Sequence, residues 1–277
     1  MAKKRRKMKK QQKRQLSIMI AVFSAVLFCL ILALVLFSCL AQDEPEPETT
    51  GIEATEETAP RNERDPDDFY MEGGFLRYHG AVTGIDVSTH QGLINWELVK
   101  EAGVDFAIIR AGYRGSTKGQ LYEDELFRDN LNGAREAGLQ VGVYFFSQAM
   151  TVEEAAEEAE FVLALLDGEP LDLPVYYDWE QVAGESRITS PGELPLTDCT
   201  VAFCEAVRQQ GYTPGVYFNQ EYGYAYLDFV RLQGYEMWLA EYGDHPTFRY
   251  HFDCLQYSDS GNLPGIETTV DLDLIFR

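Results

Sequence analysis

Short apolar runs alternate with amphipathic stretches after Gly80, and this alternation predicts strands and helices that follow one another along the chain. The apolar runs are rich in β-branched and aromatic residues, which is typical of buried strands. Eight runs cover residues 81–87, 106–110, 141–146, 173–180, 215–218, 236–240, 254–257 and 270–275. The amphipathic stretches predict helices over residues 96–102, 123–137, 151–166 and 197–210.

Regular alternation of strands and helices favours an α/β fold with a parallel sheet. Eight strands within about 200 residues favour a closed barrel over an open sheet, so we expect a modified, TIM-like (β/α) barrel. The links between the last strands are too short for full helices, and the outer ring of helices is therefore expected to be incomplete. In such barrels the active site lies at the carboxyl ends of the strands.

The beginning of the chain has a different pattern. Residues 16–41 carry no charge, and this uncharged segment is long enough for a single transmembrane helix. Nine Lys or Arg residues lie within the tail formed by residues 1–15, and this cluster predicts a cytoplasmic N-terminus with the remainder of the chain outside the cell membrane. We therefore interpret residues 16–41 as a single-pass signal anchor.

Two alternatives to the anchor remain open. A cleaved signal peptide would have a shorter apolar region, of about 7–15 residues. Lipid attachment at Cys39 is the other alternative, because the Leu36–Cys39 segment loosely resembles a lipoprotein signal, although Phe37 is bulky where such signals prefer small residues.

Residues 42–75 are rich in Glu, Asp, Pro and Thr and contain little to bury. This composition predicts a disordered, self-repelling linker that holds a domain over residues 76–277 away from the membrane.

The net charge of −22 is unevenly distributed. Outside the basic tail, 14 Lys and Arg face 45 Asp and Glu, a net charge near −31. Such an acidic domain excludes nucleic acid as a partner and suits a neutral substrate. The sequence identifies no protein partner.

Cysteine and histidine usage does not indicate a disulfide framework or a metal site. The five cysteines lack a pairing pattern and are interpreted as buried thiols, and the four histidines are scattered. The acidic residues match no calcium loop, and no phosphate-binding loop or nucleophilic serine motif is present. No metal or cofactor is expected.

Asp178 and Glu180 end the apolar run over residues 173–180. Side chains alternate along a strand, so these two carboxyls project to the same side, roughly 7 Å apart. Desolvation and mutual repulsion favour keeping one of them protonated near neutral pH. An acid and a base in one cleft are the groups that cleave a glycosidic bond, although such a pair can also mark the exit of a strand at the surface.

Other acidic and aromatic residues are expected at the same barrel mouth. Asp86 ends the first strand and Asp271 begins the last, so three β elements offer carboxylates there. Aromatic rings with polar tips complement the apolar faces and hydroxyl edges of sugars. Those at comparable positions are Tyr113, Tyr144, Tyr217, Trp238, Tyr242 and Tyr257.

The segment Gly84–Trp96 (GIDVSTHQGLINW) resembles the opening motif of the family 25 glycoside hydrolases, the Ch-type lysozymes. A lone Asp-x-Glu would be a weak signal, whereas an ordered set of motifs over residues 80–277 is specific. The later motifs, in the order of the family, are residues 106–111, 142–144, 177–180, 238–240, 255–258 and 270–272.

This resemblance implies an N-acetylmuramidase that hydrolyses the β-1,4 bond between N-acetylmuramic acid and N-acetylglucosamine in the glycan strands of peptidoglycan. By motif, Glu180 would be the general acid, and Asp178 would orient the N-acetyl group or stabilise positive charge. Asp86 and Asp271 would bind the sugar and tune the pair. Net retention is expected, whether the substrate's acetamido group or an enzyme group acts as nucleophile. The predicted substrate-binding residues are Arg110, Tyr113, Tyr144, Tyr217, Trp238, Tyr242 and Gln256.

Two positions depart from the family pattern. Asn95 stands where an Asp is common and Phe145 where a His is frequent, and both bear on fine specificity more than on activity. Two other functions remain open. One is a glycan-binding domain without turnover, and the other is a glycosidase for chitin-like chains.

Overall fold

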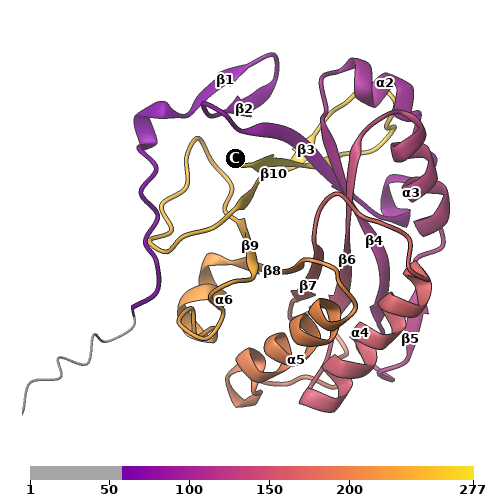
Figure 1. Cartoon of the computed structure of the whole chain (residues 1–277), viewed down its shortest axis with the longest axis vertical. Coiled ribbons are helices and arrows are strands. Elements are labelled where there is room, and N and C mark those ends of the chain that lie inside the picture. The colour runs from indigo at the N-terminus through magenta and orange to yellow at the C-terminus, as the bar shows by residue number, and fades with distance from the viewer. Residues whose placement is uncertain (1–57) are drawn as a thin grey trace, which may run out of the picture. The chain divides into compact units, whose positions relative to one another are not determined.

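Eight strands close into a barrel in the computed structural model, which describes residues 58–277 (Figure 1). Around the barrel the order is β3, β11, β10, β9, β8, β7, β6 and β4, and β4 pairs again with β3. All eight predicted strands are present. Their bounds are β3 Val82–Val87, β4 Phe106–Arg114, β6 Gln140–Ser147, β7 Val175–Trp179, β8 Pro214–Asn219, β9 Glu236–Ala240, β10 Cys254–Gly261 and β11 Val270–Ile275.

The sheet is mixed, which corrects the expected all-parallel arrangement. β11 is antiparallel to both of its neighbours, β10 and β3, whereas the other barrel pairs are parallel. Only residues 262–269 separate β10 from β11, and a parallel connection needs a crossover of a dozen or more residues. β11 therefore begins at the rim where the parallel strands end.

Helices cover the outside of the barrel unevenly (Figure 1). Each link between successive barrel strands from β3 to β8 carries a helix. By contrast, α6 between β8 and β9 has only six residues, and the links after β9 carry no helix. The incomplete ring is therefore confirmed for the described residues. The bounds are η2 Thr89–Gln91, α2 Trp96–Glu101, α3 Phe127–Glu136, α4 Val152–Leu166, η3 Pro191–Glu193, α5 Leu196–Gln209 and α6 Gln220–Ala225.

The start of the predicted helix over residues 123–137 is wrong. Residues Leu121–Glu123 form a short strand, β5, which pairs antiparallel with Gly112–Arg114 of β4. This part of β4 extends beyond its pairing with β3, which ends at Ile109, so one of its edges is open to a new partner.

Residues 58–75 belong to the folded unit, so the expected linker boundary near residue 75 lies too late. They contain η1 Pro66–Asp68 and β1 Tyr70–Glu72, which pairs with β2 Phe75–Arg77. The Arg64 guanidinium lies 3.7 Å from the ring centroid of Phe276 and donates a 2.8 Å hydrogen bond to the Phe252 carbonyl. Apolar contacts add to these, because Phe75 is buried in the core and the Phe69 ring lies 6.1 Å from that of Phe276.

The predicted basic tail, the signal anchor over residues 16–41 and residues 42–57 of the linker lie outside the described residues. Within residues 58–277 no helix combines the length and apolar character that crossing a bilayer requires.

Strand alternation divides the buried side chains into two groups. Inward-facing residues fill the interior of the barrel below the rim where the parallel strands end, and outward-facing residues pack under the helices. The inner group consists of Phe106, Ile108, Tyr144, Tyr176, Trp238 and Cys254. The three described cysteines, Cys199, Cys204 and Cys254, are buried and free, as expected.

Two glycines make room for the largest inner rings. A Cβ built on Gly84 would lie 2.2 Å from the Phe106 ring, and one on Gly215 would lie 2.2 Å from the Tyr176 ring. The floor of the barrel is therefore packed too tightly to accept another methyl group at either position.

Substitution of Gly84 by Ala tests this packing. We expect the free energy of unfolding to fall by about 1–3 kcal/mol, because the Phe106 ring must move within a closed barrel. Denaturant titration measures the change. Gly192→Ala is the matched control, since its Cβ meets nothing nearer than 3.5 Å, and an equal loss in both variants would contradict the packing argument.

Candidate active site

A cavity of about 730 Å³ opens at the rim of the barrel where the parallel strands end. The structure brings together at this cavity every residue predicted for the barrel mouth except Tyr257. They are Asp86, Arg110, Tyr113, Tyr144, Asp178, Glu180, Tyr217, Trp238, Tyr242, Gln256 and Asp271.

Strand geometry explains how the four acids meet. Asp86 and Asp178 lie two residues after inward-facing Gly84 and Tyr176, so alternation turns them inward near the rim. Glu180 follows β7 by one residue and keeps the side of Asp178. Asp271 lies directly opposite Asp86 in the antiparallel register of β11 and β3.

Burial dominates the electrostatics of the Asp178–Glu180 pair. It raises the pKa of Asp178 well above its usual range, and repulsion from Glu180 adds to the effect. Burial also raises the pKa of Glu180, with a further contribution from the charge of Asp271, while a hydrogen bond from Asp178 opposes it. The pair therefore retains one shared proton at a pH where ordinary carboxyls are ionised.

The second pair of acids lies on neighbouring strands. Burial raises the pKa of Asp86 well above its usual range, and the charges of Asp273 and Asp271 raise it further. The pKa of Asp271 is raised to about 6 by burial and by Asp259. The cavity thus holds groups that carry protons beside groups that carry negative charge, which suits proton transfer to and from a bound substrate.

Sequence reasoning missed Asp273, which lies completely buried on the inner face of β11. Its Oδ1 accepts a 2.9 Å hydrogen bond from the Trp238 indole nitrogen. Among the neighbouring charges, that of Asp273 makes the largest contribution to the raised pKa of Asp86. The signal was available, because Asp271 and Asp273 are two residues apart on a strand and must share a face.

Gln256 fixes one wall of the site. Its amide nitrogen donates a 2.7 Å hydrogen bond to Asp86 Oδ2. Its amide oxygen accepts hydrogen bonds from the hydroxyls of Tyr217 and Tyr242, each 3.0 Å long. Because the amide nitrogen has an acceptor on one side and the amide oxygen has two donors on the other, these three partners fix the orientation of the amide. The amide in turn holds Asp86 and the hydroxyls of both tyrosines in place.

Arg110 is the cation of the cavity, and Asp124, which sequence reasoning also missed, orients it. Asp124 Oδ2 lies 2.8 Å from both Nε and Nη2 of Arg110 and also accepts the Thr89 amide at 3.0 Å. The Arg110 charge lowers the pKa of Asp178 and so opposes the effect of burial there.

Aromatic rings form the floor around Trp238. Tyr144 and Tyr217 meet it edge to face, with centroids 6.0 and 4.8 Å away. Tyr257 is not part of this set, which corrects the sequence interpretation. It follows inward-facing Gln256 on β10, so it faces outward, where its hydroxyl accepts the Leu76 amide at 3.3 Å.

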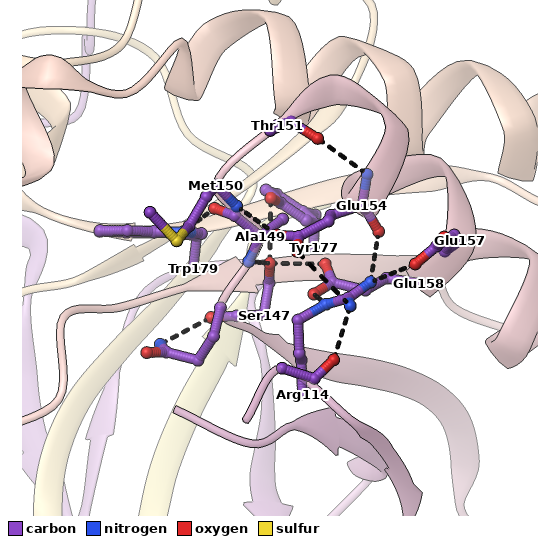
Figure 2. Close-up of polar contacts among 12 residues, drawn as sticks. Arg114, Ser147, Ala149, Met150, Thr151, Glu154, Glu157, Glu158, Tyr177 and Trp179 are labelled. Atoms are coloured by element: carbon purple, nitrogen blue, oxygen red, sulfur yellow. Dashed lines mark hydrogen bonds and ion pairs between the residues drawn. The ribbon is translucent and has the colours of Figure 1, made fainter. Parts of the chain in front are cut away.

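Hydrogen bonds on three successive residues hold the segment that carries Glu180. The Trp179 indole donates to the Ala149 carbonyl at 2.9 Å (Figure 2). The side-chain amide of Gln148 donates to the backbone carbonyl of Glu180, and the backbone N–H of Gln181 donates to the Tyr222 hydroxyl at 3.2 Å. The direction of the Glu180 carboxyl is therefore set by its fixed backbone.

The two departures from the family pattern lie away from the cavity lining. Phe145 faces outward from β6 and packs against Phe161, with centroids 6.1 Å apart. Asn95 caps α2 by accepting the Leu98 amide at 3.2 Å. In the described part of the chain, no group of three or more His, Cys, Asp or Glu side chains is arranged to hold a metal ion.

Residues 85–266 match the model of the glycosyl hydrolases family 25. The autolytic lysozyme of Clostridium acetobutylicum is 31% identical over 193 residues, which are 69% of this chain and 54% of the relative. Lysozyme M1 of Streptomyces globisporus is 46% identical over 68 residues, which are 24% of this chain and 21% of that protein. This chain thus spans about half the length of the first of these relatives.

Solved structures share the fold. The modular autolysin LytC from Streptococcus pneumoniae, in complex with a synthetic peptidoglycan ligand, matches with a TM-score of 0.63 and 24% identity over 75% of this chain and 52% of that chain. A family 25 glycosyl hydrolase from Bacillus anthracis matches with a TM-score of 0.59 and 23% identity over 71% and 89% of the two chains.

The coupling between acids can be measured by NMR titration of the side-chain carboxyls. We expect Glu180 to titrate above its usual range, and Asp271→Asn to lower its pKa, because a negative charge that disfavours ionisation is removed. Asp198→Asn is the control, since Asp198 pairs with Arg231 at the surface and acts on neither Asp271 nor Glu180. A Glu180 pKa that is unchanged in Asp271→Asn would contradict the arrangement.

Proposed function

The chain belongs to glycosyl hydrolase family 25, and from this premise we propose that it is a peptidoglycan hydrolase. It cleaves the β-1,4 bond between N-acetylmuramic acid and N-acetylglucosamine, which is the activity of a lysozyme. The observation that carries the proposal is the presence of Asp86, Asp178, Glu180 and Asp271 in one cavity. A relative that is named an autolytic lysozyme and a similar fold crystallised with a peptidoglycan ligand support this substrate class.

In this proposal Glu180 is the general acid. Its proton passes to the glycosidic oxygen as the bond from that oxygen to C1 breaks. Net retention at C1 requires two displacements. The acetamido oxygen of the substrate or an enzyme carboxylate first replaces the leaving oxygen at C1, and water, activated by Glu180 acting as a base, then replaces that group. The raised pKa of the Asp178–Glu180 pair supports this role, because the proton must still be present near neutral pH.

Asp178 assists the reaction from the same strand. Its Oδ1 is buried and has no hydrogen-bond partner in the structure, so it is available to accept the N–H of the substrate's N-acetyl group. Such a contact orients the acetamido group beside C1. Once the shared proton has passed to the glycosidic oxygen, the negative charge of the Asp178–Glu180 pair stabilises positive charge that develops on the sugar. Asp86 and Asp271 bind the sugar, and the charge of Asp271 favours the protonated form of Glu180.

The walls of the cavity suit a neutral sugar. Tyr217, Trp238 and Tyr242 offer ring faces for the C–H surface of a sugar and polar tips for its hydroxyls. The strongly acidic domain repels polyanions but not an uncharged glycan backbone.

We also propose that the enzyme acts at the cell surface as a single-pass membrane protein. The uncharged residues 16–41 would form the anchor, with the basic tail in the cytoplasm and the barrel outside. This arrangement places the hydrolase next to the wall of the cell that makes it.

The activity prediction concerns Glu180→Gln. Purified wild-type protein should release reducing ends from peptidoglycan, and the variant should be slower by about 10²-fold or more, because an amide cannot donate the proton. Glu185→Gln, an exposed glutamate in the same loop, is the control and should retain activity. Mass analysis of the fragments identifies the bond and the reducing sugar.

Several outcomes would overturn this proposal. Undiminished release by Glu180→Gln would remove the assigned acid, and binding of glycan without cleavage by the wild type would identify a binding domain. Faster cleavage of chitin oligomers than of peptidoglycan would identify a different glycosidase.

The anchor prediction concerns the location of the full chain. In cells that express it, the protein should stay with membranes after alkaline extraction, and protease added outside should remove the barrel. Cys39→Ser should leave this location unchanged if a helix rather than a lipid holds the chain. Release of the protein by alkaline extraction, or a mature N-terminus near residue 41, would contradict the anchor.

A further inference from the structure

The β4–β5 hairpin extends one wall of the cavity beyond the barrel. Beyond Ile109, β4 no longer pairs with β3, and its residues Gly112–Arg114 pair with β5 instead. Tyr113 of β4 lies opposite Tyr122 of β5, and residues directly opposite each other on two strands share a face of the sheet. Their rings are stacked, with centroids 5.2 Å apart and planes at 25°.

The stacked tyrosines form a continuous surface with the cavity. Tyr113 lines the cavity, where the Arg110 guanidinium lies 5.4 Å from its ring centroid. Tyr122 is outside the cavity lining, and 41% of its surface is exposed. Its hydroxyl donates a 2.8 Å hydrogen bond to the Gln120 amide oxygen, which fixes the tip of the ring. The Arg110 guanidinium and the rings of Tyr113 and Tyr122 therefore form a row that leads from the buried site to the surface.

A buried arginine on the opposite face makes this hairpin rigid. Arg114 follows Tyr113 and points away from the cavity, with only 4% of its side chain exposed. Its Nε lies 2.6 Å from Glu158, its Nη2 donates to the Glu154 carbonyl and its Nη1 donates to the Gly119 carbonyl, both at 2.8 Å (Figure 2). The hairpin loop is thereby joined to α4.

A second arginine, Arg187, holds the same loop and shares Glu154 with Arg114. The Arg187 amide donates to the Ser116 carbonyl at 2.9 Å, and its guanidinium binds both carboxylate oxygens of Glu154 at 2.6 and 2.7 Å. Gly119 packs so closely against this guanidinium that a Cβ there would lie 2.6 Å from Nη1. The tyrosine pair is thus held in place before any ligand arrives, which lowers the entropy cost of binding.

We propose that Tyr113 and Tyr122 form a sugar-binding subsite outside the cleavage cavity, which holds another unit of the same glycan strand. The inference rests on the proposed function, because the substrate is then a long polymer that must leave the cavity along one of its walls. The exposed phenol ring of Tyr122 offers an apolar face to the C–H surface of a sugar ring. The continuity with the cavity through Tyr113 selects a neutral glycan unit as the occupant.

This subsite makes the reaction sensitive to the length of the glycan. A long strand reaches Tyr122, whereas the shortest oligosaccharide that the enzyme cleaves occupies the cavity alone. The contact is remote from the bond that breaks, so it contributes to binding and not to the chemical step, and its loss raises KM without lowering kcat.

The test compares Tyr122→Ala with wild type on peptide-free glycan strands and on the shortest cleaved oligosaccharide. We expect KM on long strands to rise about three- to tenfold, the range for loss of one aromatic contact, with kcat unchanged. On the short substrate both constants should match wild type. Tyr122→Phe, which keeps the ring and loses the hydroxyl, should bind long strands as wild type does.

Tyr70→Ala is the matched control, because Tyr70 is also an exposed tyrosine (53%) on a short hairpin strand but, unlike Tyr122, does not stack on a ring that lines the cavity. Wild-type kinetics for Tyr122→Ala on long strands would overturn the inference, as would an equal loss on both substrates or an equal loss in Tyr122→Phe. If the wild type cleaves neither substrate, the proposed function fails. Binding of glycan strands to wild type and Tyr122→Ala, measured by affinity electrophoresis, then decides the subsite separately.

Discussion

The antiparallel pairing of β11 with β3 is the contact on which the site depends. It closes the barrel, and because β11 runs against its neighbours, the residue that begins this strand lies at the rim where the others end. Asp271 therefore stands opposite Asp86, although 185 positions separate them in the sequence. A parallel β11 would have placed Asp271 at the other end of the barrel and left the cavity with three acids.

Burying several carboxylates in one cavity costs free energy, and neutral or cationic partners around them offset part of that cost. Gln256 donates to Asp86, Trp238 donates to Asp273 and Arg110 offsets charge near Asp178. Buried carboxylates without partners would cost several kcal/mol each or take up protons. The partners relieve part of this cost, and the part that remains appears as raised pKa values, which are what proton transfer requires.

Periodicity and motif order predicted the eight strands and eleven of the residues that line the cavity, because apolar runs and inward carboxylates leave a local signal, but they wrongly added Tyr257. The direction of β11 needed a topological argument about the length of its connection. β5 has only three residues, so it carries no periodic signal, and its existence depends on the open edge of β4. Asp124 and Gln148 act through contacts made far along the chain, at Arg110, Thr89 and Glu180, which local patterns do not report. The prediction of a disordered linker up to residue 75 rested on acidic composition, whereas the contacts of Arg64, Phe69 and Phe75 hold the last part of this segment against the barrel.

The stacking of Arg64 on Phe276 also determines where the chain enters the barrel. Phe252 precedes β10 and Phe276 follows β11, so Arg64 is seated at the base, the end opposite the cavity. The first described residues are therefore fixed at the base, and a polymer can thread across the rim without meeting them. A force applied to the chain at Arg64 would be borne by the base of the barrel, far from the residues that handle the proton.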